Sequence, residues 1–276
     1  MPESICKKEE RRMLDIKAIN KTFNPGTVNA NHALKDLSLH IADGESIAVI
    51  GGNGAGKSTL LNAVAGVWSV DSGTIHLSNV DMTHLPEHKR AKYIGRVFQD
   101  PMMGTAGNMQ IEENLALAAR RGDRRGLRVG ITRAERERFR ELLRILDLGL
   151  EDRLTDKVGL LSGGQRQALT LLMATLRNPQ LLLLDEHTAA LDPKTAAKVM
   201  EVTRTLVNQD RLTTLMITHN MRDAIEYGDR LIMMYEGRIV VDVAGEQKQN
   251  LTVERLLNLF SQASGSDEVD DKLVLS

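Results

Sequence analysis

The chain of 276 residues has little of three features that would each indicate a particular class of protein. It contains a single cysteine, Cys6, so no disulfide can form within the chain, and a reducing compartment suits it. Its 36 basic and 37 acidic side chains leave a formal net charge of −1, which gives no sign of a nucleic-acid partner. Its apolar runs, such as Leu181–Leu184, are far too short to cross a bilayer.

The first residues also lack the features expected of a secretory signal. Residues 1–12 are charged and contain no apolar segment, so they do not resemble a secretory signal. We therefore expect a soluble protein whose role at a membrane would depend on a partner. The length allows an ample core, and we place one domain at residues 14–262. Residues 1–13 and 263–276 are expected to be flexible tails.

What the chain does contain is a strand, a glycine-rich turn and a helix in immediate succession. Ile47–Ile50 is apolar, residues 51–58 read Gly-Gly-Asn-Gly-Ala-Gly-Lys-Ser, and an apolar run follows. This is the phosphate-loop pattern G-x-x-x-x-G-K-[ST] in its required context. Its glycines let the backbone bend around a phosphate, and N–H groups at a helix start attract anions. Lys57 is expected to reach the β- and γ-phosphates, and the Ser58 hydroxyl to bind Mg²⁺.

Strands dominate both ends of the chain. Leu14–Ile19 alternates apolar and polar residues and is predicted to be an edge strand. Ala33–Ile41 alternates too, and the tight Asp43-Gly44 turn predicts antiparallel pairing with the phosphate-loop strand that follows. Further strands are predicted at residues 73–77, 94–98, 181–185, 213–218, 230–235 and 238–243, the last two forming a hairpin.

The pattern is helical between residues 108 and 178, which we interpret as a helical insertion. Thr132–Leu148 carries apolar residues at positions 139, 142, 143 and 146, the spacing of one helix face. Thr132 and Glu135 form a capping box at its start. Helices are also predicted at Ile111–Arg121 and from Leu161 to about Leu176.

Polar residues that suit phosphate chemistry stand at the ends of three predicted strands. Asp185 and Glu186 follow a buried strand, whose C-terminal end faces the ligand in open α/β sheets. Asp185 suits Mg²⁺, and Glu186 suits activation of a water for attack on the γ-phosphate, a role worth about 10²–10⁴ in rate. Gln99 is a candidate sensor of Mg²⁺ and this water, or an ordinary polar strand end. His219 is a candidate γ-phosphate contact, or a structural histidine.

Leu161-Ser162-Gly163-Gly164-Gln165 is the signature of ABC (ATP-binding cassette) ATPases, which the chain resembles over about residues 14–245. The family's other motifs occur in order: Walker A at 51–58, the Q-loop at Gln99, Walker B at Asp185 and Glu186, the D-loop at 190–192, and the switch histidine His219. The resemblance implies ATP binding by Phe23, which matches the adenine-stacking aromatic, and by Gly51, Asn53, Gly54, Ala55, Gly56, Lys57, Ser58, Thr59, Ser162, Gly163, Gly164 and Gln165. It implies catalysis by Glu186, His219, Gln99 and Lys57, and Mg²⁺ ligation by Ser58, Gln99 and Asp185.

The resemblance also implies the fold and the assembly. The fold would be α/β, with a P-loop NTPase RecA-like core, an antiparallel β subdomain and a helical signature subdomain at 108–178. Two copies would pair head to tail and sandwich two ATP molecules, each between one P-loop and the partner's signature. Because the signature glycines open a helix, they offer a second anion site. This site lies on a separate helical lobe, so we expect the other copy's γ-phosphate to fill it.

Two features stand outside these motifs. His187 follows Glu186 where many relatives have proline, and we expect a tolerated loop residue rather than a pH-responsive contact. Residues 120–140 carry nine arginines and three acids. We expect a solvated helical face there, and a surface for anionic lipid or a permease is the alternative.

The first functional hypothesis is the ATPase subunit of a bacterial importer. It would dimerise on ATP and power a separate membrane permease for small-molecule uptake, with an amino acid as a candidate and a substrate-binding protein acting indirectly. The helical lobe and the Gln99 loop would form a groove for the permease's coupling helix. The subunit would lie on the cytoplasmic face of the inner membrane, held there by the permease. The alternatives are an exporter subunit and a soluble ABC protein acting on DNA or ribosomes, whose coiled coils and tandem cassettes this chain lacks.

Overall fold

The computed structural model describes residues 12–123 and 130–264. Most of the predicted tails and part of the arginine-rich run therefore lie outside the described residues. The larger sheet has the strand order β10-β9-β3-β8-β7-β6, and the smaller one has the order β2-β1-β4-β5. The strands of the larger sheet are β3 (Ser46–Ile50), β6 (Ile94–Val97), β7 (Leu181–Asp185), β8 (Thr214–Ile217), β9 (Arg230–Tyr235) and β10 (Arg238–Ala244). Those of the smaller sheet are β1 (Arg12–Phe23), β2 (Asn31–Ala42), β4 (Ser72–Leu77) and β5 (Val80–Asp81).

The larger sheet is buried on both faces. All of its strands are parallel except β10, which pairs antiparallel with β9. Successive side chains of a strand point to opposite faces, and β3 shows the result. Ile47 and Val49 pack with the core cluster that contains α1, whereas Ala48 and Ile50 pack with the cluster of the other helices. Such two-sided burial explains the continuous apolar runs of the parallel strands.

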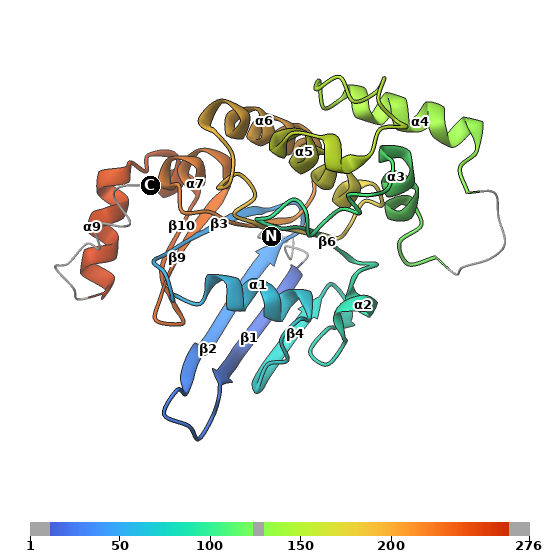
Figure 1. Cartoon of the computed structure of the whole chain (residues 1–276). Coiled ribbons are helices and arrows are strands. Elements are labelled where there is room, and N and C mark those ends of the chain that lie inside the picture. Colours follow the sequence, from blue (N-terminus) through green and yellow to red (C-terminus); the bar gives the residue numbers. More distant parts are fainter. Residues whose placement is uncertain (1–11, 124–129, 265–276) are drawn as a thin grey trace, which may run out of the picture.

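Helices cover the two faces of this sheet unequally (Figure 1). One helix, α1 (Lys57–Ala65), packs between the larger and the smaller sheet. The opposite face is covered by α5 (Gly163–Thr175), α6 (Pro193–Asp210) and α7 (Met221–Tyr227). Beside them lie α3 (Ile111–Ala119) and α4 (Arg133–Arg144), with the short turn η1 (Val158–Leu160) before α5. The remaining helices are α2 (Glu87–Arg90), α8 (Gly245–Gln249) and α9 (Val253–Ser264).

Several predicted elements are confirmed by the structure. The α/β fold class is confirmed, and the segment between β6 and β7 contains α3, α4 and α5. The capping box of Thr132 and Glu135 opens α4, although the helix ends at Arg144 rather than Leu148. The hairpin between β9 and β10 turns at Glu236 and Gly237, whose φ angles of 45° and 80° are both positive, as a tight hairpin turn requires.

Two predictions about the first strands are wrong. Leu14–Ile19 belongs to β1, which is an interior strand because it pairs with both β2 and β4. Alternation reports that one face of a strand is buried, and it carries no information about neighbours in the sheet. The predicted pairing across Asp43-Gly44 does not form either. That turn passes the chain from one sheet to the other, and β3 pairs in parallel with β8 and β9.

Candidate nucleotide site

The phosphate loop follows β3 and ends where α1 begins. Its glycines at positions 51, 54 and 56 have positive φ angles of 150°, 80° and 100°, as the sequence predicted. A Cβ on Gly51 would lie 2.3 Å from the Met234 carbonyl oxygen, and one on Gly56 would lie 2.6 Å from that of Ala33. Backbone conformation and close packing therefore both require glycine at these two positions. No side chain caps the start of α1, so its first N–H groups remain available to a bound phosphate.

Lys57 is buried at the base of the loop. Its Nζ donates hydrogen bonds to the carbonyl oxygens of Gly51 at 2.7 Å and Gly52 at 3.1 Å. Burial lowers the pKa of the ammonium, and the nearby carboxylates of Glu186 and Asp185 oppose this effect. The cation predicted to bind the phosphates therefore lies among the strand-end acids, with its amine already directed into the loop.

Asp185, a predicted Mg²⁺ ligand, is the last residue of β7. Burial raises the pKa of its carboxyl group, and the positive charges of Arg96 and Lys57 counteract that shift. Ser58, the second residue of α1, is exposed. Within the described ranges no group of three or more His, Cys, Asp or Glu side chains could hold a metal ion. A site with few oxygen ligands fits Mg²⁺, which keeps several waters and takes further oxygens from nucleotide phosphates.

Glu186 and His219 meet at the ends of two neighbouring strands. Asp185 pairs in register with Ile217, so the residues that follow each strand lie at the same edge of the sheet. His219 Nδ1 is 2.9 Å from Glu186 Oε1. Glu186 has a φ of 44°, a left-handed conformation that costs a non-glycine residue about 1–3 kcal/mol and often marks a functional site. A carboxylate held beside an imidazole can accept a proton from water and keep its orientation.

Two predicted residues lie in other surroundings. Gln99 is exposed, two residues beyond the end of β6. Phe23 ends β1, and its ring meets Trp68 edge to face with the centroids 5.4 Å apart. The Lys21 ammonium lies 5.6 Å from the centre of the same ring. The roles of Gln99 at the metal and of Phe23 at adenine remain predictions.

The signature residues form the start of α5. The Ser162 side chain accepts a hydrogen bond from the Gln165 N–H, and the Gln165 side chain accepts one from the Ser162 N–H. Gly163 and Gly164 occupy the first turn, where helix geometry supplies no acceptor for N–H groups. Ser162 and Gly163 are exposed. Gly164 packs against Thr195 of α6, because an added Cβ would lie 2.0 Å from its methyl group.

His187 is a buried structural residue. It is 3% exposed, and its Nε2 lies 3.0 Å from Thr203 Oγ1. The Thr203 hydroxyl donates to the Val199 carbonyl oxygen, so it accepts from the imidazole and places the ring proton on Nε2. Burial lowers the pKa of His187 to about 4, which keeps the ring neutral at ordinary pH. The structure thus favours the structural interpretation of this histidine.

Sequence reasoning missed one charged residue of the site, Arg96. It lies on β6, and its Nη2 is 2.8 Å from Asn62 Oδ1 and 3.5 Å from Asp185 Oδ2. A signal was present, because Arg96 is the one charged residue in the otherwise apolar run 94–98. Its neighbours could not be read from the sequence, since β7 and α1 are distant along the chain.

Comparisons with known proteins show the family of the chain. The family model of the ABC transporter matches residues 34–189. A tyrosine transport ATP-binding protein of Clostridioides difficile is 46% identical over 251 residues, which are 91% of this chain and 100% of that protein. The sulfate/thiosulfate import ATP-binding protein CysA of Vibrio cholerae is 38% identical over 75% of this chain and 53% of that protein, so this chain spans about half of its length.

Solved structures resemble the fold as well. The dimeric post-hydrolysis structure of the ATP-binding cassette MJ0796 bound to ADP and Pi matches with a TM-score of 0.72 and 30% identity. The match covers 84% of this chain and 98% of that one. Among the helices of the described residues, none has the length and apolar character needed to span a membrane. The chain belongs to the ABC transporter family, and it is one of the family's ATP-binding ATPase subunits.

Proposed function

We propose that this ATPase powers a separate membrane permease for the uptake of a small molecule, with an aromatic amino acid as the first candidate. The relative from Clostridioides difficile supports this substrate class, because it is named for tyrosine transport and matches along its whole length. Other relatives are named for sulfate and spermidine import, which supports uptake more broadly than any one substrate.

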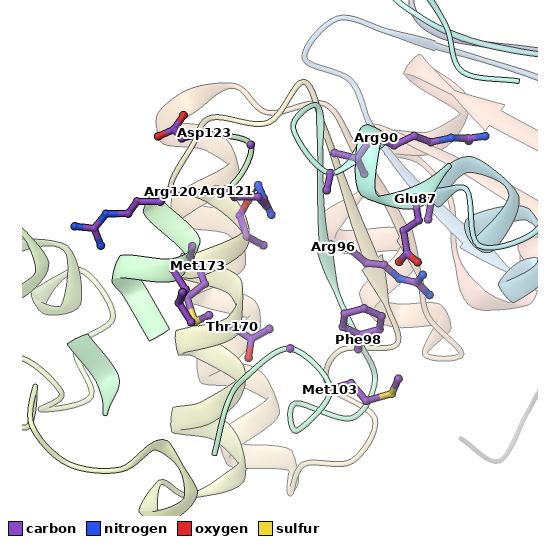
Figure 2. Close-up of a pocket in the computed structure, with 18 of the residues that line it drawn as sticks. Glu87, Arg90, Arg96, Phe98, Met103, Arg120, Arg121, Asp123, Thr170 and Met173 are labelled. Atoms are coloured by element: carbon purple, nitrogen blue, oxygen red, sulfur yellow. Dashed lines mark hydrogen bonds between the residues drawn. The ribbon is translucent and has the colours of Figure 1, made fainter. Parts of the chain in front are cut away.

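The observation that carries the proposal is a groove between β6 and the helices α3 and α5, with a cavity volume of about 980 Å³. Figure 2 shows Phe98 and Arg96 on one side of it, and Thr170, Met173 and Arg121 on the other. Apolar side chains and arginines both line this groove. Such a surface suits a short helix that inserts apolar side chains and carries polar groups at its ends, which is one of the common modes of recognition. We assign the groove to the permease.

ATP binding would connect two copies of the chain. A γ-phosphate bound in the phosphate loop of one copy would also contact the N–H groups of Gly163 and Gly164 in the second copy. Mg²⁺, held by Ser58, Asp185 and Gln99, would neutralise phosphate charge. Glu186 would take a proton from the attacking water, while His219 holds the Glu186 carboxylate in place. Loss of the γ-phosphate would then release the two copies from each other and move the permease.

This assignment gives the expected partners and location. Two copies would bind a permease from the cytoplasmic side of the membrane, and a substrate-binding protein would act through that permease. The solved relative described as a dimer with ADP and Pi supports the paired arrangement. No nucleic-acid partner is needed.

The test is transport by the complete system. The chain would be expressed with candidate permease and binding-protein genes from the same genome, in cells that lack aromatic amino-acid uptake. We expect uptake of labelled tyrosine that requires all components and stops with Glu186→Gln. Labelled sulfate and spermidine serve as substrate controls. ATP-dependent loss of tyrosine from preloaded cells would show that the direction of transport is export rather than uptake. A complex that moves tyrosine in neither direction would refute the substrate class.

A further inference from the structure

Arg96 places a positive charge within an apolar layer of the fold. Its strand, β6, pairs with β7 so that Arg96 is opposite Leu183. Facing residues of paired strands point to the same side of a sheet, and so do residues two apart along one strand. Arg96, Leu183 and Asp185 therefore share the side on which Leu183 packs with the core cluster of α1.

The guanidinium of Arg96 contacts residues of three segments, two in the nucleotide site and one in the groove. Its Nη2 lies 2.8 Å from the amide oxygen of Asn62, on the phosphate-loop helix α1. The same nitrogen is 3.5 Å from the carboxylate of Asp185, at the end of β7. The guanidinium carbon lies 4.5 Å from the centre of the Phe98 ring, a distance typical of a cation–π contact. The Arg96 side chain is only 13% exposed, so these contacts are shielded from water.

Of its two polar partners, Arg96 forms the stronger hydrogen bond with Asn62, because the distance is 2.8 Å to Asn62 and 3.5 Å to Asp185. The amide therefore anchors the guanidinium to α1, and the anchored cation attracts Asp185 toward that helix. Since α1 also carries Ser58, we expect this attraction to orient the carboxylate toward Ser58, another of the predicted Mg²⁺ ligands. A neutral side chain at position 96 would leave Asp185 half-buried beside Lys57 alone.

The same side chain also lines the groove described above (Figure 2). Phe98 stacks on the guanidinium and lines the groove with it, so a segment bound there would contact the ring and the cation together. Arg96 thus contacts both the groove and the carboxylate of Asp185, the predicted Mg²⁺ ligand.

We propose that Arg96 is a positioning residue that orients Asp185 for Mg²⁺ and makes the metal site responsive to contacts made in the groove. The identity of the groove's occupant rests on the proposed function, whereas the orientation of Asp185 belongs to the isolated subunit. The two parts can therefore fail separately.

The test measures Mg²⁺ binding rather than turnover. The isolated full-length chain would be titrated with Mg²⁺ in the presence of a fluorescent ATP analogue, and with Mn²⁺ followed by electron paramagnetic resonance. We expect Arg96→Met to weaken binding of the metal about tenfold, the lower range for loss of a group that orients a ligand. Binding of the nucleotide in EDTA should stay the same. Arg96→Lys should recover part of the loss, because an ammonium keeps the charge without the geometry.

Arg121→Met is the matched control, since Arg121 lines the same groove but donates its hydrogen bond to the Ala174 carbonyl oxygen. It should leave the Mg²⁺ titration unchanged. Phe98→Ala tests the link to the groove, and a shift in the same direction, smaller than that of Arg96→Met, is expected. An unchanged or tighter metal affinity in Arg96→Met would overturn the orienting role. A normal titration in Phe98→Ala would overturn the link, and neither result would bear on whether the chain drives uptake.

Discussion

The two helix starts that the sequence assigned to phosphate binding are built differently. The start of α1 has Gly56 in a left-handed conformation and no side-chain cap, and it is followed by the buried Lys57. The start of α5 has an extended Ser162 whose side chain is engaged in a capping box with Gln165. The first is a curved loop with its own cation, and the second is an exposed helix end whose capping box engages the N–H groups of Ser162 and Gln165.

This difference teaches which site can work alone. The phosphate loop combines an uncapped helix start with the buried ammonium of Lys57, so we expect it to bind a triphosphate within a single copy. The signature offers only the N–H groups of a helix start, and a helix end contributes only about 0.3–1 kcal/mol to binding of a charge at an exposed surface. In the proposed dimer it would become useful when the other copy brings a phosphate that is already bound. The following predictions test that division.

The largest effect is expected for Glu186→Gln, which leaves both helix starts intact. An amide cannot accept the proton of the attacking water, so hydrolysis should fall by about 10²–10⁴. ATP should still bind, and a lasting ATP-bound dimer should be visible by light scattering. Glu141→Gln, at an exposed position on α4, is the control and should hydrolyse normally. Turnover near that of the wild type would show that another group activates the water.

Ser162→Arg should impair the start of α5 and leave the start of α1 unchanged. The substitution places a long side chain at the exposed start of α5, so the ATP-driven dimer should be lost from light scattering. Binding of a fluorescent ATP analogue by the monomer should remain, because the phosphate loop is untouched. Gln262→Arg, at an exposed position on α9, is the matched control and should dimerise. An unaltered dimer with Ser162→Arg would contradict the sandwich arrangement.

A pair of glycine substitutions compares the two sites at the level of packing. Gly56→Ala meets a backbone carbonyl in a left-handed conformation and should destabilise the fold by about 3 kcal/mol, with loss of ATP binding. Gly164→Ala meets only the Thr195 side chain, so it should cost about 1–3 kcal/mol, and adding Thr195→Ser should restore most of it. Urea unfolding measures both. Failure of the rescue would show that the signature glycine is required for a reason other than this contact.

The smallest effect concerns pH, at the histidine between Glu186 and α6. The pKa of His187 falls from an ordinary 6.5 to about 4 on folding, so its contribution to stability is complete above pH 6.5 and is lost as the pH falls toward 4. Between pH 7.5 and 5 we expect the wild type to lose roughly 2 kcal/mol through this residue. His187→Asn keeps a donor for Thr203. Over the same pH range, its free energy of unfolding in urea should fall by roughly 2 kcal/mol less than that of the wild type. Equal pH profiles for the two chains would refute the assignment.

Much of the site could be predicted because its signals are local. A glycine that needs positive φ, a lysine at a helix start and acids at a strand end each lie within a few residues of their structural cause. The meeting of Glu186 with His219 could be anticipated as well, because parallel strands bring their C-terminal ends to one edge. What failed was the pairing of strands. Neither the interior place of β1 nor the separation of β2 from β3 has a local signal, because hydrogen-bonded neighbours are selected across the whole chain.

Local signals were therefore enough to predict a nucleotide-binding α/β chain with a helical insertion, since periodicity and turn chemistry act over short distances. The positions of single charged residues in apolar runs depend instead on the folded chain. Arg90 is 2% exposed and donates to the carbonyl oxygens of Leu85, Ala63 and Val64. It therefore caps the C-terminal end of α1, and all three of these acceptors are uncharged. Arg96, six residues later, joins α1 to Asp185. A buried guanidinium needs several acceptors at once, and only a folded chain brings acceptors together from distant segments.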